Sequence, residues 1–401
     1  NIENSMNKEH SKFLILGIIV VGMVLRLPFT SIPPILGSIA KSQHVSVGQL
    51  GMLTTIPLIA FAIFSSLAPK TAQKFGLERA FALMLGLMII GSIVRVVNTP
   101  FLYFGTLLIG IGIAHLNVLL PSVIRTYFPT KIGPMTSLFT FSMMLSTALG
   151  ASMAAPITAM TNWHMFIIIL SIALFIALII WLPNERFAVK HKQNKVSTSH
   201  VIRTQEKISV WKNKYAWLLL FFCGMQSAMF YVLMAWGPTM AVQTGLSPAV
   251  AGIFSGLNSL IGLPFALIIP TIIARSTRKQ RQILMSIISL SGVFGYLLLL
   301  HPVGTFSYWL IVNILIGVST SGLFPYLLTT FSLKTSSPSQ TAQISGMVQS
   351  GGYLIAALGP ALFGYAFSWF HSWTPQIFVI LVLFILMIIA MVIVEKKDKI
   401  L

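Results

Sequence analysis

Long apolar segments recur along nearly the whole chain and leave few ways for it to fold. Hydrophobic residues make up 56% of the 401 residues, and charged residues only 8%. A transmembrane helix needs about 20 largely apolar residues, so windows of that size predict about twelve spans. The expected spans are 13–39, 47–69, 79–97, 101–128, 133–159, 163–183, 214–243, 247–273, 280–300, 303–330, 339–368 and 372–394. The sequence therefore predicts an all-α integral membrane protein with twelve transmembrane helices.

One long polar stretch divides the predicted spans into six before it and six after it. This stretch, residues 184–213, carries basic residues among Ser, Thr, Gln and Asn. Two interpretations fit it: a solvated cytoplasmic linker, or an element that binds an anionic partner or lipid surface. We expect an N-terminal six-helix bundle over 1–183, a linker over 184–213 and a C-terminal six-helix bundle over 214–401.

Basic residues lie almost entirely on one side of the predicted membrane. Of the 26 Lys and Arg residues, only Lys41 and Arg95 fall on the opposite side, and Arg26 lies inside a span. The positive-inside rule then places both termini and the linker in the cytoplasm, with the chain crossing the cell membrane many times. The net charge of +19 therefore indicates topology, and no nucleic-acid partner is expected.

The two halves resemble each other at an offset of about 201–207 residues, as in transporters built from repeats. Gly51 and Pro69 bracket the second predicted span with the same spacing as Gly252 and Pro270 in the eighth. A basic loop follows each of these spans. The repeat supports two pseudo-symmetric six-helix bundles.

Arg26 is the residue that most needs an explanation. All seven carboxylates lie outside the predicted spans, whereas Arg26 lies within the first. A charge at the centre of a bilayer costs about 2.5–3.5 kcal/mol on insertion scales, so such residues usually mark a pathway or a binding site. The planar guanidinium suits a carboxylate or another small oxyanion, and Thr30, four residues later, shares its helix face. The alternative is a structural arginine that binds carbonyl groups at a proline-broken helix.

Four segments carry a family likeness: residues 25–36 (LRLPFTSIPPIL), 110–125 (GIGIAHLNVLLPSVIR), 234–238 (MAWGP) and 322–325 (GLFP). With the two-bundle pattern, they resemble the major facilitator superfamily and, within it, the cyanate/nitroimidazole permease family. The resemblance implies transport of small polar or anionic solutes. It also implies a cavity lined by the first, fourth, seventh and eleventh spans.

Polar and aromatic side chains in these spans, together with Asn258 in the eighth span, are the candidate solute ligands. By the internal offset, Ser227 beside Gln226 occupies the position that corresponds to Arg26. Each amide is also suited to bonding between helices. The predicted substrate-binding residues are Arg26, Thr30, Asn117, Gln226, Tyr231, Trp236, Asn258, Gln349 and Tyr353.

His115 lies in the interior of a predicted span, whereas the other histidines fall in the termini, in loops or at span ends. Histidine titrates near neutral pH, so His115 is a candidate proton-coupling group. A neutral histidine bonded to a neighbouring helix is the alternative. No catalytic constellation, nucleotide-binding loop or metal-ligand spacing stands out, so we expect neither an enzyme nor a cofactor or metal site.

These observations predict a secondary active transporter that moves a small anionic or polar solute by alternating access, with proton coupling as one option. We expect it to work as a monomer in the lipid bilayer. One alternative is an efflux transporter for uncharged or weakly basic aromatic compounds, and another is a membrane receptor that does not transport. Arg26 distinguishes the anion transporter from the efflux transporter, because only an anionic solute depends on the positive charge of Arg26.

Overall fold

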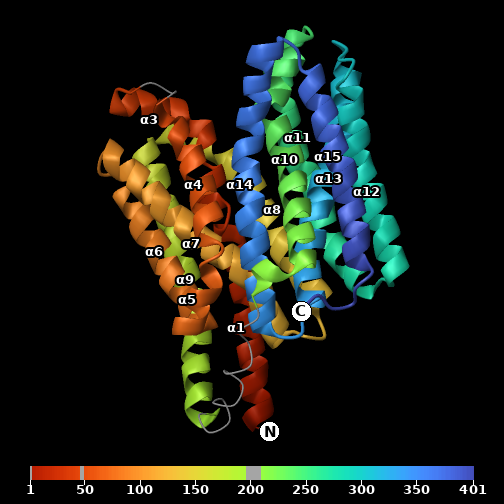
Figure 1. The fold of residues 1–401 in the computed structure, drawn as a ribbon. Helices are drawn as coiled ribbons and strands as arrows, with labels where there is room; N and C mark the ends of the chain where they lie inside the picture. Colours follow the sequence, from red (N-terminus) through yellow and green to blue (C-terminus); the bar gives the residue numbers. More distant parts are fainter. Residues whose placement is uncertain (1, 46–48, 196–208) are drawn as a thin grey trace. The chain divides into compact units, whose positions relative to one another are not determined.

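The structure is a computed structural model that describes residues 2–45, 49–195 and 209–401 (Figure 1). These residues form helices and connecting turns, with no β-strand among them. Ten of the helices are long and apolar enough to cross a membrane. An eleventh crossing results if α4 (Met52–Phe64) and α5 (Ala68–Phe75), which are bent by 60° between Thr55–Phe64 and Ala68–Phe75, cross as one span. The predicted all-α membrane fold is confirmed. The described residues contain ten or eleven candidate spans and not the predicted twelve.

Two compact units divide the chain. Unit 1 comprises Asn1–Phe128, Leu138–Val210 and Ser337–Gly346, and unit 2 comprises Pro129–Ser137, Trp211–Ser336 and Met347–Leu401. Two helices contribute to both units, because α8 (Ile132–Met160) starts in unit 2 and α14 (Pro338–Phe370) starts in unit 1.

Unit 1 is built around α7, of which 83% is buried in its most apolar part. A side chain at Gly105 of α7 would put its Cβ 2.2 Å from the Gly91 carbonyl oxygen of α6, so glycine lets the two backbones touch. The helices of unit 1, besides α4, α5 and α8, are α1 (Ile2–Val24), α2 (Leu27–Thr30), η1 (Pro33–Ile35), α3 (Leu36–Gln43), η2 (Gln49–Gly51), α6 (Leu77–Val94), α7 (Thr99–Tyr127) and α9 (Trp163–Lys195).

In unit 2, α10 and α13 are equally buried, each with 67% of its most apolar part inside the protein. Glycines again allow close packing: a Cβ at Gly352 of α14 would lie 2.3 Å from Cys223 Sγ of α10. The helices of unit 2, besides α14, are α10 (Lys214–Gln243), α11 (Pro248–Arg275), α12 (Arg278–Leu298), α13 (Phe306–Leu333) and α15 (Thr374–Glu395), preceded by η3 (Val210–Lys212).

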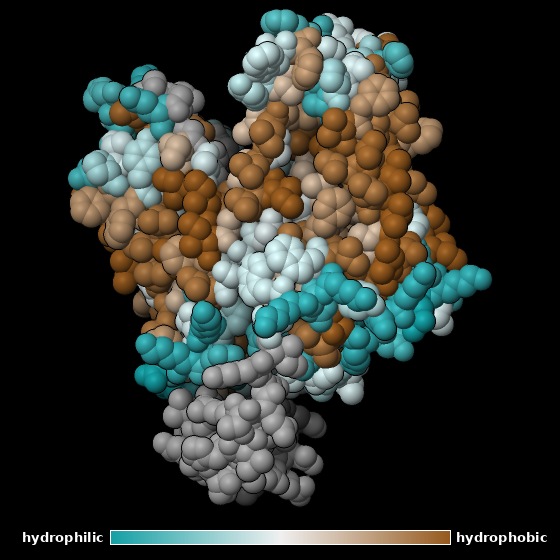
Figure 2. Space-filling model, in the orientation of Figure 1, coloured by the Kyte–Doolittle hydropathy of each residue, from teal (hydrophilic) through white to brown (hydrophobic). Residues whose placement is uncertain are grey.

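The outward helix faces carry large apolar side chains. Ile172 on α9, Phe294 on α12 and Val379 on α15 are all more than half exposed. Figure 2 shows such residues as brown areas on the helices, with hydrophilic residues gathered near the helix ends. An apolar exterior of this kind is what hydrocarbon chains of a bilayer require.

Three sequence expectations need correction. The first predicted span, 13–39, is interrupted between α1 and α2, and the part of it that is long and apolar enough to cross a membrane is Lys12–Thr30. The sixth extends well beyond its predicted end at residue 183, because α9 continues to Lys195, and residues 196–208 of the predicted linker lie outside the described residues. Three carboxylates, Glu78, Glu185 and Glu395, lie inside the apolar helices α6, α9 and α15, because these helices extend beyond the purely apolar windows.

Candidate functional site

The first span is broken beside Arg26. Helix α1 ends at Val24, Arg26 is the N-cap of the short helix α2, and Pro28 lies in the first turn of α2. Proline has no backbone N–H, so the helical bond that residue 28 would donate four residues back is lost. The break leaves backbone polar groups to be satisfied by other donors.

Arg26 lies at this break with its side chain partly buried. Among the described residues its guanidinium has no hydrogen-bond or ion-pair partner. The Thr30 hydroxyl donates to the Arg26 carbonyl oxygen over 2.8 Å, so Thr30 is bound to the backbone of Arg26 and not to its charge. A guanidinium with free donors beside an interrupted helix is suited to bind an anion.

Arg95, predicted to lie on the opposite side of the membrane from most basic residues, is a buried group that was not among the predicted site residues. The side chain is 1% exposed, and Nη1 donates to the Pro28 carbonyl oxygen over 3.2 Å. The Nε and Nη2 atoms are buried without a hydrogen-bond partner among the described residues. Arg95 therefore binds a backbone carbonyl group of the short helix that follows Arg26. Its neighbours Ile93, Val94, Val96 and Val97 are apolar, but an arginine at the end of an apolar run is also typical of an ordinary span end.

His115 and Asn117 are both buried on α7, each 4% exposed. His115 Nδ1 lies 2.8 Å from the Ile111 carbonyl oxygen, and Nε2 lies 3.1 Å from the Thr71 hydroxyl of α5. A neutral ring that donates from Nδ1 and accepts at Nε2 satisfies both contacts. The contacts fit the structural alternative for His115, and its part in proton coupling stays a prediction.

In unit 2, α10 brings Gln226 and Ser227 together in the interior. Gln226 Nε2 donates to the Ser227 hydroxyl over 2.9 Å, and the two side chains are 3% and 6% exposed. Tyr231, one turn on, is also buried, and its ring packs edge-to-face on Phe230. These residues share one region of α10, and their contact with solute stays a prediction.

The other predicted ligands of unit 2 lie on α11 and α14. Gln349 and Tyr353 are buried one turn apart on α14, at 0% and 5% exposed. Asn258 of α11 lies against α13, since a Cβ at Gly317 would be 2.9 Å from Asn258 Oδ1. This Oδ1 atom has no hydrogen-bond partner among the described residues.

Trp236 is held in a packing cluster. Its indole N–H donates to the Pro360 carbonyl oxygen over 2.8 Å, and its ring lies 5.4 Å from that of Trp373. A Cβ at Gly364 would meet the Trp236 ring at 2.0 Å, so the ring fills the space that glycine leaves. These contacts give Trp236 a packing role, and its contact with solute stays a prediction.

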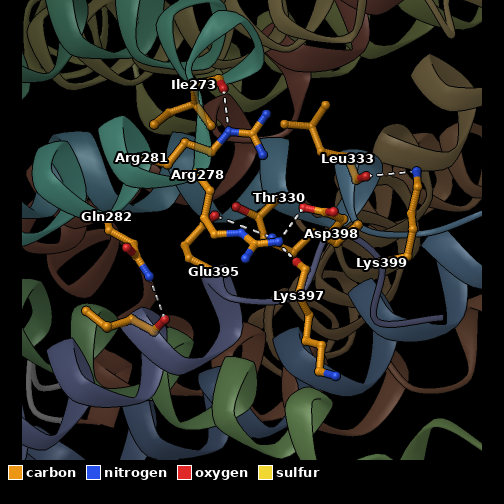
Figure 3. A network of polar contacts seen from close by, with 12 residues as sticks. Ile273, Arg278, Arg281, Gln282, Thr330, Leu333, Glu395, Lys397, Asp398 and Lys399 are labelled. Carbon is orange, nitrogen blue, oxygen red and sulfur yellow. Dashed lines mark hydrogen bonds and ion pairs between the residues drawn. The ribbon is translucent and has the colours of Figure 1, made fainter.

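A cluster of charges within unit 2 lies where the end of the chain meets α12 and α13 (Figure 3). Lys334 Nζ lies 3.4 Å from Glu395 Oε2, and the two side chains are 3% and 1% exposed. The hydroxyl of Tyr326 donates to the other Glu395 oxygen, and Lys334 Nζ donates to the Lys397 carbonyl oxygen over 2.5 Å. This buried cation is thus neutralised, unlike Arg26.

Backbone contacts and an outer ion pair extend this cluster. Lys399 Nζ donates to the carbonyl oxygens of Leu333 and Thr335, over 3.0 Å each. Arg278 pairs with Asp398 over 3.0 Å at the surface. The positions of these basic residues in the sequence predict topology, but their pairing was not predicted.

The comparisons with known proteins agree with this architecture. The sequence profile of the Major Facilitator Superfamily matches residues 14–360. The chain belongs to this superfamily. It is 37% identical over 385 residues to the uncharacterized transporter YycB of Bacillus subtilis (strain 168), covering 95% of this chain and 92% of YycB.

A second relative supports the narrower resemblance. The chain is 33% identical over 387 residues to the 2-nitroimidazole transporter of Escherichia coli (strain K12), covering 96% of each. The fold is similar to that of the proton:xylose symporter XylE, with a TM-score of 0.77, 15% identity and 98% of each chain covered. The chain is therefore a membrane transporter of the superfamily and not an enzyme, and it resembles the cyanate/nitroimidazole permeases as predicted.

Proposed function

We propose that this transporter moves a small anionic or polar solute across the cytoplasmic membrane by alternating access, with Arg26 binding the negative charge. The observation that carries the proposal is the Arg26 guanidinium, which is partly buried at a helix break and has no partner among the described residues. A structural arginine at such a site would use its donors on the freed carbonyl groups. Here it is Arg95 that binds Pro28, which leaves the donors of Arg26 for solute.

The remaining predicted ligands complete the proposal in chemical terms. Gln226, Gln349 and Tyr353 are polar groups buried in unit 2, and such groups give a solute hydrogen bonds that water would otherwise supply. The proposal leaves proton coupling through His115 as an option, and the uptake assay described below tests it by comparing uptake with and without a pH gradient. In the proposed orientation, both termini lie in the cytoplasm, as the distribution of basic residues predicts.

The test is uptake of small radiolabelled solutes, anionic and neutral, into proteoliposomes with and without an imposed pH gradient. Wild type, Arg26→Ala and a control, Arg79→Ala, are compared; Arg79 is exposed in the first turn of α6. We expect uptake of an anion by wild type and the control and its loss in Arg26→Ala. Transport of neutral compounds alone, unchanged in Arg26→Ala, would overturn the proposal.

A second function is favoured by one comparison. Similarity to a 2-nitroimidazole transporter supports movement of an uncharged or weakly basic aromatic compound. In that case, labelled 2-nitroimidazole crosses the proteoliposome membrane and Arg26→Ala transports it as well as wild type does. Binding of a solute without net flux in any of these assays would indicate a receptor.

A further inference from the structure

A cavity that opens to the surface lies within unit 1, where α3 meets the end of α8 and the start of α9. Its volume is about 480 Å³. The lining residues come from α3, from the end of α8 and from the start of α9: Ser38, Lys41, Ser42, Thr158, Thr161, Asn162, Trp163 and His164. None of the predicted solute ligands lines it.

The groups that line this cavity are mostly hydrogen-bond donors. Lys41 supplies an ammonium group, and no lining residue is acidic. Asn162 caps α9, because its Oδ1 accepts from the Met165 N–H over 2.8 Å, which leaves its amide hydrogens available. The cavity also lies at the N-terminus of α9, a helix of 33 residues, where the helix dipole favours a negative charge.

Two buried polar atoms at this cavity have no partner. Trp163 is 3% exposed and Thr158 is 7% exposed, and both line the cavity. The Trp163 indole nitrogen and the Thr158 hydroxyl have no hydrogen-bond partner among the described residues. By contrast, the nearby Thr161 hydroxyl donates to the Ile157 carbonyl oxygen over 2.6 Å. A buried donor left unsatisfied is unfavourable by about 1–3 kcal/mol, so these atoms point to a missing ligand.

We infer that this cavity binds a small oxyanion, a carboxylate or a phosphate group, at a site separate from Arg26. The ammonium group of Lys41 and the dipole of α9 attract the charge. The Trp163 N–H and the Thr158 hydroxyl donate to its oxygens. Such an oxyanion reaches the cavity either as a free solute or as the headgroup of an anionic lipid.

The test uses the full-length protein labelled with 5-fluorotryptophan, with the Trp163 resonance assigned by its loss in Trp163→Phe. Benzoate is titrated in a detergent free of phospholipid, and benzamide serves as its neutral counterpart. A parallel sample in phosphatidylglycerol nanodiscs is compared with one in phosphatidylcholine nanodiscs. We expect a saturable shift of the Trp163 resonance with benzoate but not with benzamide. A shift in phosphatidylglycerol alone would identify the lipid headgroup as the ligand and still support the site.

Matched variants separate this site from general effects. Lys41→Gln is expected to weaken benzoate binding by about fivefold, as for an exposed ion pair. Thr158→Val is expected to weaken it by a similar factor, about that of one hydrogen bond. The controls are Lys74→Gln, at an exposed lysine of α5, and Thr147→Val, whose hydroxyl already donates to the Met143 carbonyl oxygen. Neither control should change the titration.

Several results would overturn the inference. These are no saturable shift with benzoate or phosphatidylglycerol, an equal shift with benzamide, or binding that neither Lys41→Gln nor Thr158→Val weakens. The titration is repeated in Arg26→Ala, where we expect no change. Loss of binding there would assign the ligand to Arg26 instead. If uptake is unchanged in Arg26→Ala while benzoate still shifts the Trp163 resonance, the proposed function is disproved and the inferred oxyanion site is supported.

Discussion

In unit 1 the guanidinium groups of Arg26 and Arg95 have no carboxylate partner among the described residues, whereas in unit 2 Lys334 is paired with Glu395. The first span of unit 1 is also broken at Arg26, while its counterpart α10 is continuous over 30 residues despite Pro238. A neutralised buried cation belongs to the packing of its unit. A cation left without a counter-ion, beside a broken helix, is available to a charged ligand, and this difference can be tested.

The largest effect is expected from breaking the neutralised pair. Glu395→Gln leaves Lys334 buried without a counter-ion, which destabilises a protein by about 3–5 kcal/mol. The measurement is thermal and chemical unfolding of the purified protein in detergent. Lys396→Gln, at an exposed neighbour of Glu395, is the control and should unfold as wild type does. Equal stability of Glu395→Gln and wild type would contradict the structural role of the pair.

The pH dependence sharpens this prediction. Burial lowers the pKa of Lys334 from its usual 10.5, with Glu395 acting in the opposite direction. A lysine with a lowered folded-state pKa binds protons more weakly when folded, so stability increases as pH rises from the lowered value to 10.5. Loss of Glu395 lowers this pKa further. Part of the stability lost in Glu395→Gln should therefore return as the pH rises from the lowered pKa of Lys334 to 10.5. A loss of stability that is the same at every pH would argue against a buried, unpaired Lys334 charge as its cause.

Arg26 should show the reverse behaviour, with a large effect on transport and a small one on folding. Arg26→Ala is expected to reduce anion uptake by about 100-fold, as for loss of a bidentate charged contact of about 3 kcal/mol. Its unfolding free energy should stay within about 1 kcal/mol of wild type, because no partner is left unpaired. Arg26→Lys keeps the charge without the fork and should be intermediate. A stability loss like that of Glu395→Gln would make Arg26 structural.

Arg95 lies between these extremes, because one of its nitrogens is bonded and two are not. Arg95→Met removes the bond to the Pro28 carbonyl oxygen and also the two unsatisfied donors, so we expect a stability change of no more than about 1 kcal/mol. Anion uptake should fall by about tenfold, because α2 is no longer held at the break, and a misplaced binding group weakens its contacts. Arg95→Lys, which keeps a donor, should restore part of the uptake. Full uptake by Arg95→Met would show that Arg95 does not position Arg26.

The sequence alone predicts features that depend on local composition, and it does not predict contacts between residues far apart in the chain. Apolar length and the side of the basic residues predict spans and bundles, because both depend on local composition. Arg26 was found because a charge inside an apolar window is visible in one segment. The burial of Arg95 and its bond to Pro28 join residues 67 positions apart, and composition near Arg95 resembles an ordinary span end. Pairing of Lys334 with Glu395 and the unpartnered Trp163 nitrogen likewise depend on tertiary contacts.

The smallest effect is expected at the outer pair of the same charged cluster. The side chains of Arg278 and Asp398 are 49% and 86% exposed, and water screens such pairs strongly. The hydrogen bond from Arg278 lowers the pKa of Asp398 below its usual 3.8. A depressed carboxyl pKa contributes stability above the unfolded value and loses it as pH falls through the folded value.

Asp398→Asn should therefore unfold within error of wild type at neutral pH. Any small difference should vanish once the medium is acidic enough to protonate Asp398 in the wild type. The measurement is the unfolding midpoint of both proteins from neutral to strongly acidic pH, beside Glu395→Gln. A deficit in Asp398→Asn as large as in Glu395→Gln would mean that exposure does not separate the two pairs. Both pairs would then stabilise the protein by holding the C-terminal segment in place, and the burial of Lys334 would not explain the effect of Glu395→Gln.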